Sequence, residues 1–268
     1  MRVGLLYNSS SLPEKFLFEG LTKSFISVGI HADIFSPFKE FTHILVHESQ
    51  YDLQKENLDK HKTLGQKIII FTPQQESPLK EIVISSDKKT KHKFIDLGVF
   101  YKPKIKRKKF IRLCWIGDRK EIEDTSEIQE IISNSGIPFD IISLSDFPAT
   151  TFKGVTYKVF NETSFDTDSI VISTSDYVTL ECLVRGITCL QLHSGGKIFS
   201  KLSEKVPEHL KEFCKEYKSS QQILDTIELL KLTDRLFDPL IKQLRSEILK
   251  SYLLNYRIIE YVEFFDGL

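Results

Sequence analysis

Residues 168–192 read Asp-Ser-Ile-Val-Ile-Ser-Thr-Ser-Asp-Tyr-Val-Thr-Leu-Glu-Cys-Leu-Val-Arg-Gly-Ile-Thr-Cys-Leu-Gln-Leu, a stretch in which apolar runs alternate with polar breaks. The run at 169–172 predicts a short buried parallel strand, and the run at 187–192 predicts a second one. Between them, residues 177–185 fit a short helix that Gly186 ends. The stretch therefore predicts the strand, turn, helix and strand of an α/β fold.

Polar side chains fill the turn between the first of these strands and the helix. Ser173, Thr174 and Ser175 suit turn and N-cap positions. A helix N-terminus exposes backbone N–H groups and a partial positive charge, so it favours an anion. We expect these three residues either to bind a phosphate group or to act only as capping residues.

The composition limits the kind of protein that this stretch can belong to. The chain has 268 residues, 41% hydrophobic and 28% charged, which suits a globular protein of one large or two small domains. Lys+Arg and Asp+Glu number 37 each, so the net charge does not favour nucleic acid as a partner. The four cysteines show no C-x-x-C spacing, and no metal site or disulfide framework is expected. Neither a signal peptide nor a membrane span is predicted, so we expect a cytoplasmic protein, at most peripheral to the inner face of the membrane.

A basic segment divides two series of alternating strands and helices. The pattern predicts a Rossmann-like N-terminal domain at 1–102, a linker at 103–109 and a C-terminal domain with terminal helices at 110–268. The first loop, 8–13, lacks the G-x-G-x-x-G glycines, so NAD binding is not supported. Six of the eight residues in 102–109 are basic. This segment is either a solvated linker or a contact for an anionic membrane surface or lipid diphosphate.

Two turns in the C-terminal half are further candidates for anion binding. Gly117, Arg119 and Lys120 follow the predicted strand 110–116, and a glycine-rich loop that ends at Lys197 follows the strand 187–192. The carboxyl ends of parallel strands meet at one edge of a sheet, where open α/β sheets bind ligands. We expect both turns at that edge, with cations that either contact phosphate or are only solvated.

The chain ends in a long predicted helix at 239–265. Pro239 suits the first helical turn, and apolar residues recur along one face. Because this helix is too long to serve one small sheet, we expect it to run back across the N-terminal domain.

The run Leu-Glu-Cys-Leu-Val-Arg-Gly-Ile-Thr at 180–188 is similar to the Leu-Glu-Ala-Met-Ala-x-Gly-x-Pro run of glycosyltransferases with the GT-B fold. The segment Ile-Asp-Leu-Gly-Val-Phe-Tyr-Lys-Pro at 95–103 resembles the Asn-Gly-Val-Asp-x-x-x-Phe-x-Pro segment that precedes the linker of that family. The resemblance implies two Rossmann-like domains, an acceptor-side domain followed by a nucleotide-sugar domain. It also implies that Glu181 holds the ribose hydroxyls of the donor and that Ser173, Thr174 and Ser175 hold its diphosphate.

The sequence departs from this family pattern at one chemically important position. Retaining members carry a second glutamate eight residues before the ribose glutamate, and Ser173 occupies that position here. A weaker similarity, in chain size, is to the nucleotide-sugar hydrolase of pseudaminic acid synthesis. The Gly-x-Gly-His element of that enzyme has no counterpart in residues 8–13.

Transfer of the sugar needs a stabilised leaving group and a base for the acceptor. Helix N–H groups together with Arg119, Lys120 and Lys197 could stabilise the diphosphate without a metal or another cofactor. His47, at the end of the predicted strand 43–47, is the first candidate for the base, and Glu48 is the second. A histidine at a strand end is also a common half-buried loop residue, so that alternative stays open.

These observations together predict a glycosyltransferase that moves a sugar from a nucleotide sugar to a surface-glycan or lipid-linked acceptor, as in cell-surface polysaccharide biosynthesis. One alternative is a nucleotide-sugar hydrolase, which would release product from the donor alone. Another is a non-catalytic GT-B-like binding protein.

Overall fold

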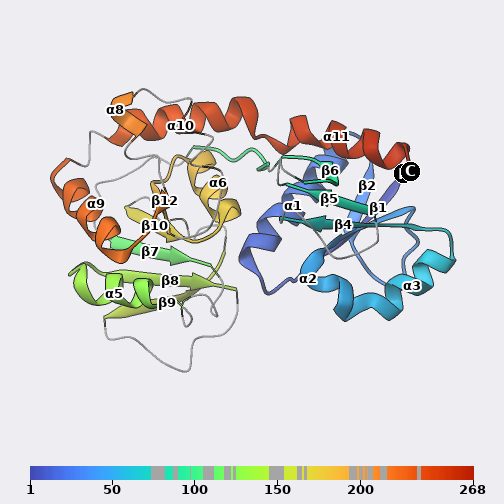
Figure 1. Cartoon of the computed structure of the whole chain (residues 1–268), viewed down its shortest axis with the longest axis horizontal. Helices are drawn as coiled ribbons and strands as arrows, with labels where there is room; N and C mark the ends of the chain where they lie inside the picture. The colour runs from blue at the N-terminus through green and yellow to red at the C-terminus, as the bar shows by residue number, and fades with distance from the viewer. Residues whose placement is uncertain are drawn as a thin grey trace. The chain divides into compact units, whose positions relative to one another are not determined.

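The computed structural model describes residues 1–73, 82–86, 90–96, 98–104, 112–117, 122, 125–144, 154–161, 165, 168–192, 198, 202, 204, 208–211, 216–233 and 237–268. The chain divides into two compact units (Figure 1). The first unit contains Met1–Ser9, Glu14–Phe100 and Ser251–Leu268, and the second contains Ser10–Pro13 and Tyr101–Lys250. Of the predicted basic linker, positions 105–109 lie outside the described residues.

The first unit is built on a six-stranded parallel sheet with the strand order β2-β1-β3-β4-β5-β6. Its strands are β1 (Arg2–Leu6), β2 (His31–Ile34), β3 (His43–His47), β4 (Lys67–Thr72), β5 (Ile82–Ser85) and β6 (Lys93–Phe94). Its helices are α1 (Leu12–Ser27), α2 (Glu48–Tyr51), the 3-10 helix η1 (Asp52–Gln54), α3 (Lys55–Thr63) and α11 (Leu254–Asp266). The central strands β3 and β4 are nearly continuous apolar runs because helices cover both faces of a parallel sheet.

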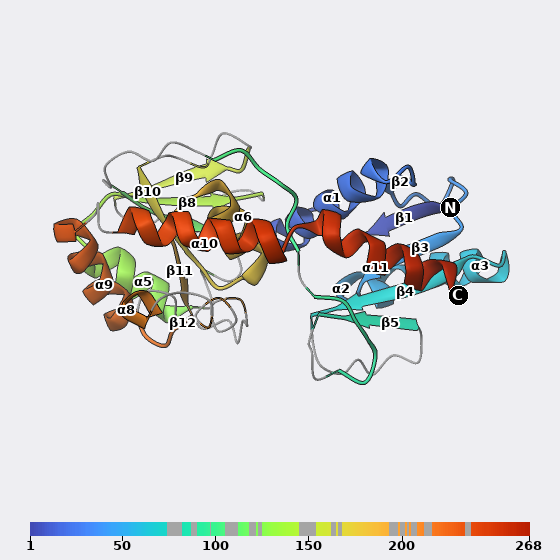
Figure 2. The ribbon, with the colours of Figure 1, turned by 90° about the horizontal axis from the view of Figure 1, so that it is seen from above.

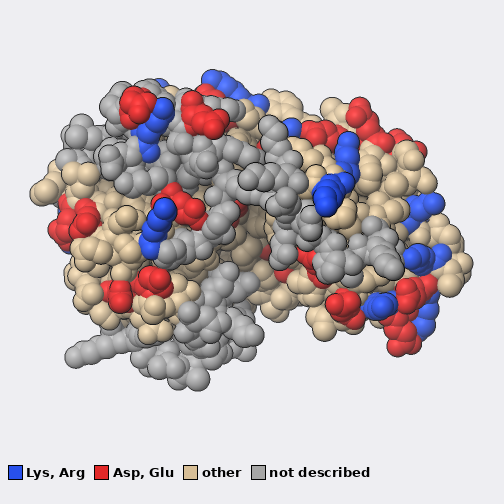
Figure 3. All heavy atoms as spheres, in the orientation of Figure 1, with Lys and Arg blue, Asp and Glu red and all other residues tan. Residues whose placement is uncertain are grey.

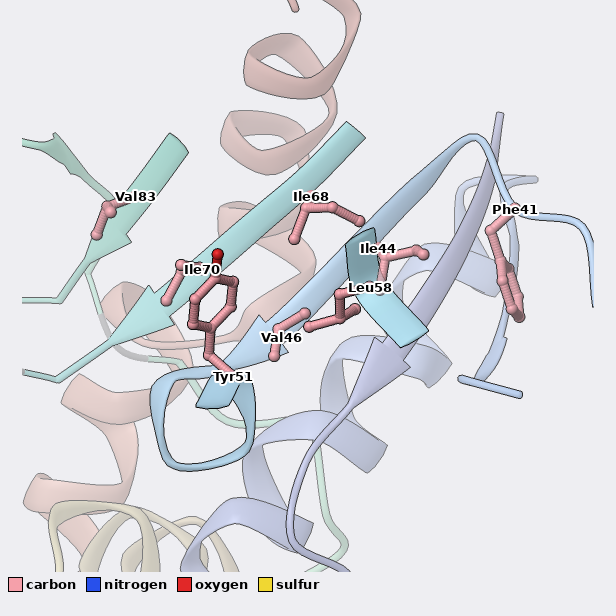
Figure 4. Close-up of a cluster of buried hydrophobic side chains, with 8 residues drawn as sticks. All are labelled: Phe41, Ile44, Val46, Tyr51, Leu58, Ile68, Ile70 and Val83. Carbon is pink, nitrogen blue, oxygen red and sulfur yellow. The ribbon is translucent and has the colours of Figure 1, made fainter. Parts of the chain in front are cut away.

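One face of this sheet packs against α2 and α3. Every second residue of β3 and β4 points to that face, where Tyr51 of α2 and Leu58 of α3 cover them (Figure 4). The cluster consists of Phe41, Ile44, Val46, Tyr51, Leu58, Ile68, Ile70 and Val83. Each such side chain contributes about 1.5–3 kcal/mol on burial, so the register of β3 is strongly fixed. His47, the last residue of β3, therefore points to the opposite face, toward α1.

The second unit repeats the architecture with the strand order β12-β11-β10-β7-β8-β9, again all parallel. Its strands are β7 (Arg112–Ile116), β8 (Phe139–Ser143), β9 (Val155–Val159), β10 (Ser169–Ser173), β11 (Cys189–Leu192) and β12 (Glu216–Tyr217). Its helices include α5 (Ser126–Asn134), α6 (Asp176–Arg185), α8 (Glu208–Lys211), α9 (Ser220–Thr233) and α10 (Phe237–Ser251). The predicted class, an α/β protein with two Rossmann-like domains, is confirmed.

The stretch 168–192 forms β10, α6 and β11 at the centre of the second sheet, as its apolar pattern predicts. Gly186 ends α6 with a φ of 77°, a left-handed conformation that glycine adopts without steric cost. From Tyr177 to Arg185, every residue of α6 is buried. This part of the helix has no solvated face, and its burial determines the environment of Glu181 and Arg185, the two charged residues within it.

The C-terminal end of the chain forms two helices, so the prediction of a single helix at 239–265 is wrong. Between α10 and α11, Leu253 is extended and its neighbours pair with Val99. The Val99 N–H donates to the Tyr252 carbonyl at 2.8 Å, and the Leu254 N–H donates to the Val99 carbonyl at 3.0 Å. These lateral bonds replace helical ones and break the helix without a proline or glycine.

The predicted return of the chain end to the first sheet is confirmed by α11. The ring of Phe265 stacks on that of Phe25 with the centroids 5.8 Å apart, and Tyr261 packs edge-on against Phe25. Figure 2 shows α11 running along the first unit beside α1. Residues 251–268 thus belong to the first unit, although they follow the second in sequence.

On the face drawn in Figure 3, the described Lys and Arg residues are interspersed with Asp and Glu and form no large area of one sign. The described part of the chain contains no helix that is long and apolar enough to cross a membrane.

Candidate functional site

Three side chains from three segments meet at the carboxyl edge of the first sheet. Glu14 lies in the first turn of α1, His47 ends β3, and Ser49 lies in α2. The Ser49 hydroxyl donates to Glu14 Oε1 at 2.9 Å, and His47 Nδ1 lies 2.9 Å from Ser49 Oγ and 3.3 Å from Glu14 Oε1. The other carboxylate oxygen of Glu14 accepts from the backbone N–H of Asn8 at 2.8 Å. The cluster thus joins the loop after β1 to the end of β3.

His47 is held in an apolar environment on its remaining sides. The rings of Phe18 and Phe71 lie with their centroids 5.9 Å and 6.1 Å from the imidazole. This burial lowers the pKa of His47 to about 4, although the nearby Glu14 carboxylate acts in the opposite direction by favouring the charged ring. His47 is therefore neutral at pH 7. None of the described residues hydrogen-bonds its Nε2 atom, and its side chain keeps 11% of its surface exposed.

Glu48, the second predicted base, has a different environment from His47. The Thr72 hydroxyl donates to Glu48 Oε2 at 2.5 Å, which ties the carboxylate to the end of β4. The structure therefore brings His47 together with Glu14 and Ser49, and Glu48 together with Thr72. Geometry favours His47, since a base needs an acceptor atom within reach of the substrate and no described residue engages His47 Nε2.

The carboxyl edge of the second sheet holds the three residues predicted to bind phosphate. Ser173 is buried, and its hydroxyl accepts from the Ser175 N–H at 3.0 Å, which closes the turn before α6. Ser175 is the N-cap residue of α6 by its backbone angles, but its side chain makes no capping bond. Thr174 Oγ1 is buried, and no residue in the described part of the chain hydrogen-bonds it. Within this turn, therefore, the Ser173 hydroxyl closes the turn, and the hydroxyls of Thr174 and Ser175 make no turn or capping bond.

Gly117 lies at the same edge, because β7 is the direct neighbour of β10 in the sheet. Its N–H donates to the Ile142 carbonyl at 3.3 Å. The predicted cations Arg119, Lys120 and Lys197 lie outside the described residues.

Glu181, the predicted ribose ligand, is buried within α6 and paired with a residue one turn later. Its side chain is 3% exposed, that of Arg185 is 4% exposed, and Arg185 Nη1 donates to the Glu181 carboxylate. Arg185 also lies over the ring of Phe165, 4.0 Å from its centroid. This pair gives Glu181 a structural role, and its contact with ribose stays a prediction.

Sequence reasoning missed Glu14 and Ser49. The one signal for Glu14 was its place in the first turn of a helix, where acidic residues are common for reasons of stability alone. Among the described residues, no group of three or more His, Cys, Asp or Glu side chains could hold a metal ion.

No protein-family model matches the sequence, and no curated protein matches it. Solved structures do match the fold. T4 phage BGT in complex with UDP and Mn²⁺ aligns over 100% of this chain and 99% of its own, with a TM-score of 0.62 and 11% identity. Alr3699/HepE of Anabaena in complex with UDP-glucose aligns over 98% and 99%, with a TM-score of 0.69 and 10% identity.

The chain has the GT-B fold. A third match, an α-glucosyltransferase in complex with UDP, covers 99% of this chain and 100% of its own at a TM-score of 0.61 and 10% identity. The matches extend over both units and the C-terminal helices, so the GT-B architecture includes the part of the chain that returns to the first sheet. The predicted resemblance to glycosyltransferases with the GT-B fold is thereby confirmed at the level of fold.

Proposed function

We propose that the protein transfers a sugar from a uridine diphosphate sugar to a hydroxyl group of a surface-glycan or lipid-linked acceptor. The observation that carries the proposal is that, in a GT-B fold, the neutral side chain of His47 lies at the carboxyl edge of the first sheet and is oriented by its contact with Ser49. Structures of the same fold were solved with UDP or UDP-glucose. Open α/β sheets bind their ligands at this edge.

In the proposed reaction, His47 Nε2 takes the proton of the acceptor hydroxyl while its oxygen attacks the anomeric carbon. The bond between that carbon and the diphosphate oxygen breaks, and UDP leaves with the electron pair. The N–H groups at the start of α6 and the hydroxyl of Thr174 bind the diphosphate, with Arg119, Lys120 and Lys197 as the proposed cations. Glu181 holds the ribose in this proposal, and the donor is a substrate, with no metal or other cofactor assigned.

Donor binding and transfer are tested separately. The melting temperature is measured with UDP, UDP-glucose and CMP, and we expect a rise with the uridine nucleotides because a ligand stabilises the state that binds it. UDP release is then followed from UDP-sugars with and without pooled glycan and lipid-linked acceptors, in Mn²⁺ and in EDTA. Release without acceptor would identify a hydrolase instead, and no shift with any nucleotide would refute the proposal.

The role of His47 is tested by His47→Gln, which removes the base and keeps a side chain of similar size. We expect transfer to fall about 10²–10⁴-fold while the shift with UDP is unchanged, since general-base catalysis contributes that much. Glu48→Gln is the matched control because it alters the neighbouring carboxylate. Unchanged transfer in His47→Gln would make the histidine structural. Absence of transfer in the wild type itself would favour a non-catalytic GT-B-like binding protein.

A peripheral contact of residues 102–109 with an anionic leaflet is part of this proposal, as is a location on the inner face of the membrane. The supporting observation is the six basic residues in this segment. Co-sedimentation with vesicles that contain anionic lipid should be strong at low salt and weak at high salt, because salt screens such contacts. Equal sedimentation with neutral vesicles would contradict it.

A further inference from the structure

Two contacts at Nδ1 determine which ring nitrogen of His47 carries the proton. At pH 7 the ring is neutral, so one nitrogen has a proton and the other has a lone pair. Nδ1 lies 2.9 Å from Ser49 Oγ and 3.3 Å from the backbone nitrogen of Ser49. In the first contact Nδ1 could donate, and in the second it would have to accept.

The single hydroxyl proton of Ser49 decides between these two arrangements. That hydroxyl donates to Glu14 Oε1 at 2.9 Å, so Ser49 Oγ can only accept from the histidine. The carboxylate strengthens this bond, since hydrogen bonds to ionised groups are about twice as strong as neutral ones. The competing interaction is the N-cap hydrogen bond of α2, in which His47 Nδ1 accepts from the Ser49 N–H at 3.3 Å. It is the longer of the two, and with the proton on Nδ1 this first-turn N–H gives up its capping bond, as a weaker neutral interaction.

We infer that Glu14, acting through the hydroxyl of Ser49, fixes the proton of neutral His47 on Nδ1 and leaves the lone pair on Nε2 as the base. Glu14 is a positioning residue in this arrangement and does not itself contact the acceptor. The inference rests on the proposed function for the role of the base. The placement of the proton, however, is a property of the folded protein without substrate.

The backbone of Asn8 makes Glu14→Gln a sharp perturbation. The Asn8 N–H donates to Glu14 Oε2 at 2.8 Å, which favours a glutamine amide whose oxygen faces Asn8 and whose NH₂ faces Ser49. Ser49 Oγ then accepts from this NH₂, and its hydroxyl proton turns to His47 Nδ1. The ring proton moves to Nε2, and the base is lost although the size and packing of the side chain are kept.

The experiment is a long-range ¹H–¹⁵N spectrum of uniformly labelled protein at pH 7, which separates protonated ring nitrogens from those with a lone pair. The chain has seven histidines, and the signals of His47 are those absent from His47→Gln. We expect the Nδ1–H form in the wild type, the Nε2–H form in Glu14→Gln, and the wild-type form in the control Glu19→Gln on the same helix. An Nε2–H ring in the wild type, or an unchanged ring in Glu14→Gln, would overturn the inference.

Transfer rates give the second readout. We expect kcat to fall at least about 100-fold in Glu14→Gln with little change in the KM for the donor, because only the base is altered. Ser49→Ala should lose less than about tenfold, since Glu14 Oε1 already lies 3.3 Å from Nδ1 and can accept its proton directly. If Glu14→Gln does not fold, the ring form in Ser49→Ala decides, and an Nε2–H ring there would refute the role of Glu14. Absence of transfer in the wild type with the Nδ1–H form present would refute the proposed function alone.

Discussion

The pairing of Glu181 with Arg185 predicts that removing one partner destabilises the second unit. In Glu181→Ala, Arg185 would remain buried and charged without its carboxylate, which typically costs about 3–5 kcal/mol. For a unit of this size each kcal/mol lowers the melting temperature by about 2–4 °C, so we expect a decrease of about 6–20 °C. The sole tryptophan, Trp115, is fully buried in β7 and reports unfolding of this unit by its fluorescence.

The paired variant Glu181→Leu/Arg185→Met separates structure from ribose binding. Replacing both charges by apolar side chains of similar size is often neutral or stabilising, so this variant should recover most of the loss. Its affinity for UDP is then measured by calorimetry at a temperature where it is folded. Lost affinity in the folded variant supports the ribose role, and retained affinity makes Glu181 purely structural. A single variant Glu181→Ala as stable as the wild type would refute the reasoning from burial.

Three further predictions concern the stability of the first unit. The pKa of His47 is about 4 in the folded protein and 6.5 in the unfolded chain, so between these values the unfolded state binds more protons. We therefore expect the free energy of unfolding to fall by about 3 kcal/mol as the pH drops from 7 to 4. Circular dichroism at each pH measures this fall, and the contribution should be absent in His47→Gln. In Gly98→Ala the new Cβ would lie 2.8 Å from Leu254 Cδ2 and 3.3 Å from Leu254 Cα. We expect the free energy of unfolding, measured in urea, to fall by about 1–3 kcal/mol, and to fall less when the same change is made in a Leu254→Ala background. The paired variant Glu14→Met/His47→Leu replaces both buried polar groups by apolar side chains, so it should unfold at the same or a higher urea concentration than the wild type and show no transfer. A large loss of stability in this variant would make the cluster structural.

The central part of the fold was predictable because local signals agree there. In 168–192 the apolar runs, the polar turn and the C-terminal glycine all indicate the same elements, and the parallel sheet forms around them. The end of the chain was mispredicted for the opposite reason. The break at Leu253 depends on hydrogen bonds to Val99, more than 150 residues earlier, and nothing local marks it.

The candidate site was predictable only where a residue ends a strand. His47 was found in this way, because open α/β sheets bind ligands at the carboxyl ends of their parallel strands. Glu14 and Ser49 reach it from α1 and α2, so their contact with the histidine follows from strand order and helix placement, which the sequence pattern does not specify. Glu181 shows the converse: its motif suggested a ligand role, while the burial of α6 on all sides gives it a charged partner inside the protein.

The cluster of Glu14, His47 and Ser49 also bears on whether the protein is a catalyst. A buried carboxylate and imidazole lose their hydration, and apolar residues of similar volume would hold the same elements together at least as well. Proteins retain such locally unfavourable groups mainly at functional sites, where stability is given up for chemistry. A relative that only binds would use no more of this histidine than Nδ1, which contacts Ser49 at the start of α2, whereas a base also needs the Nε2 atom that no described residue engages. The arrangement therefore favours a protein that removes a proton from a bound acceptor over one that only binds it.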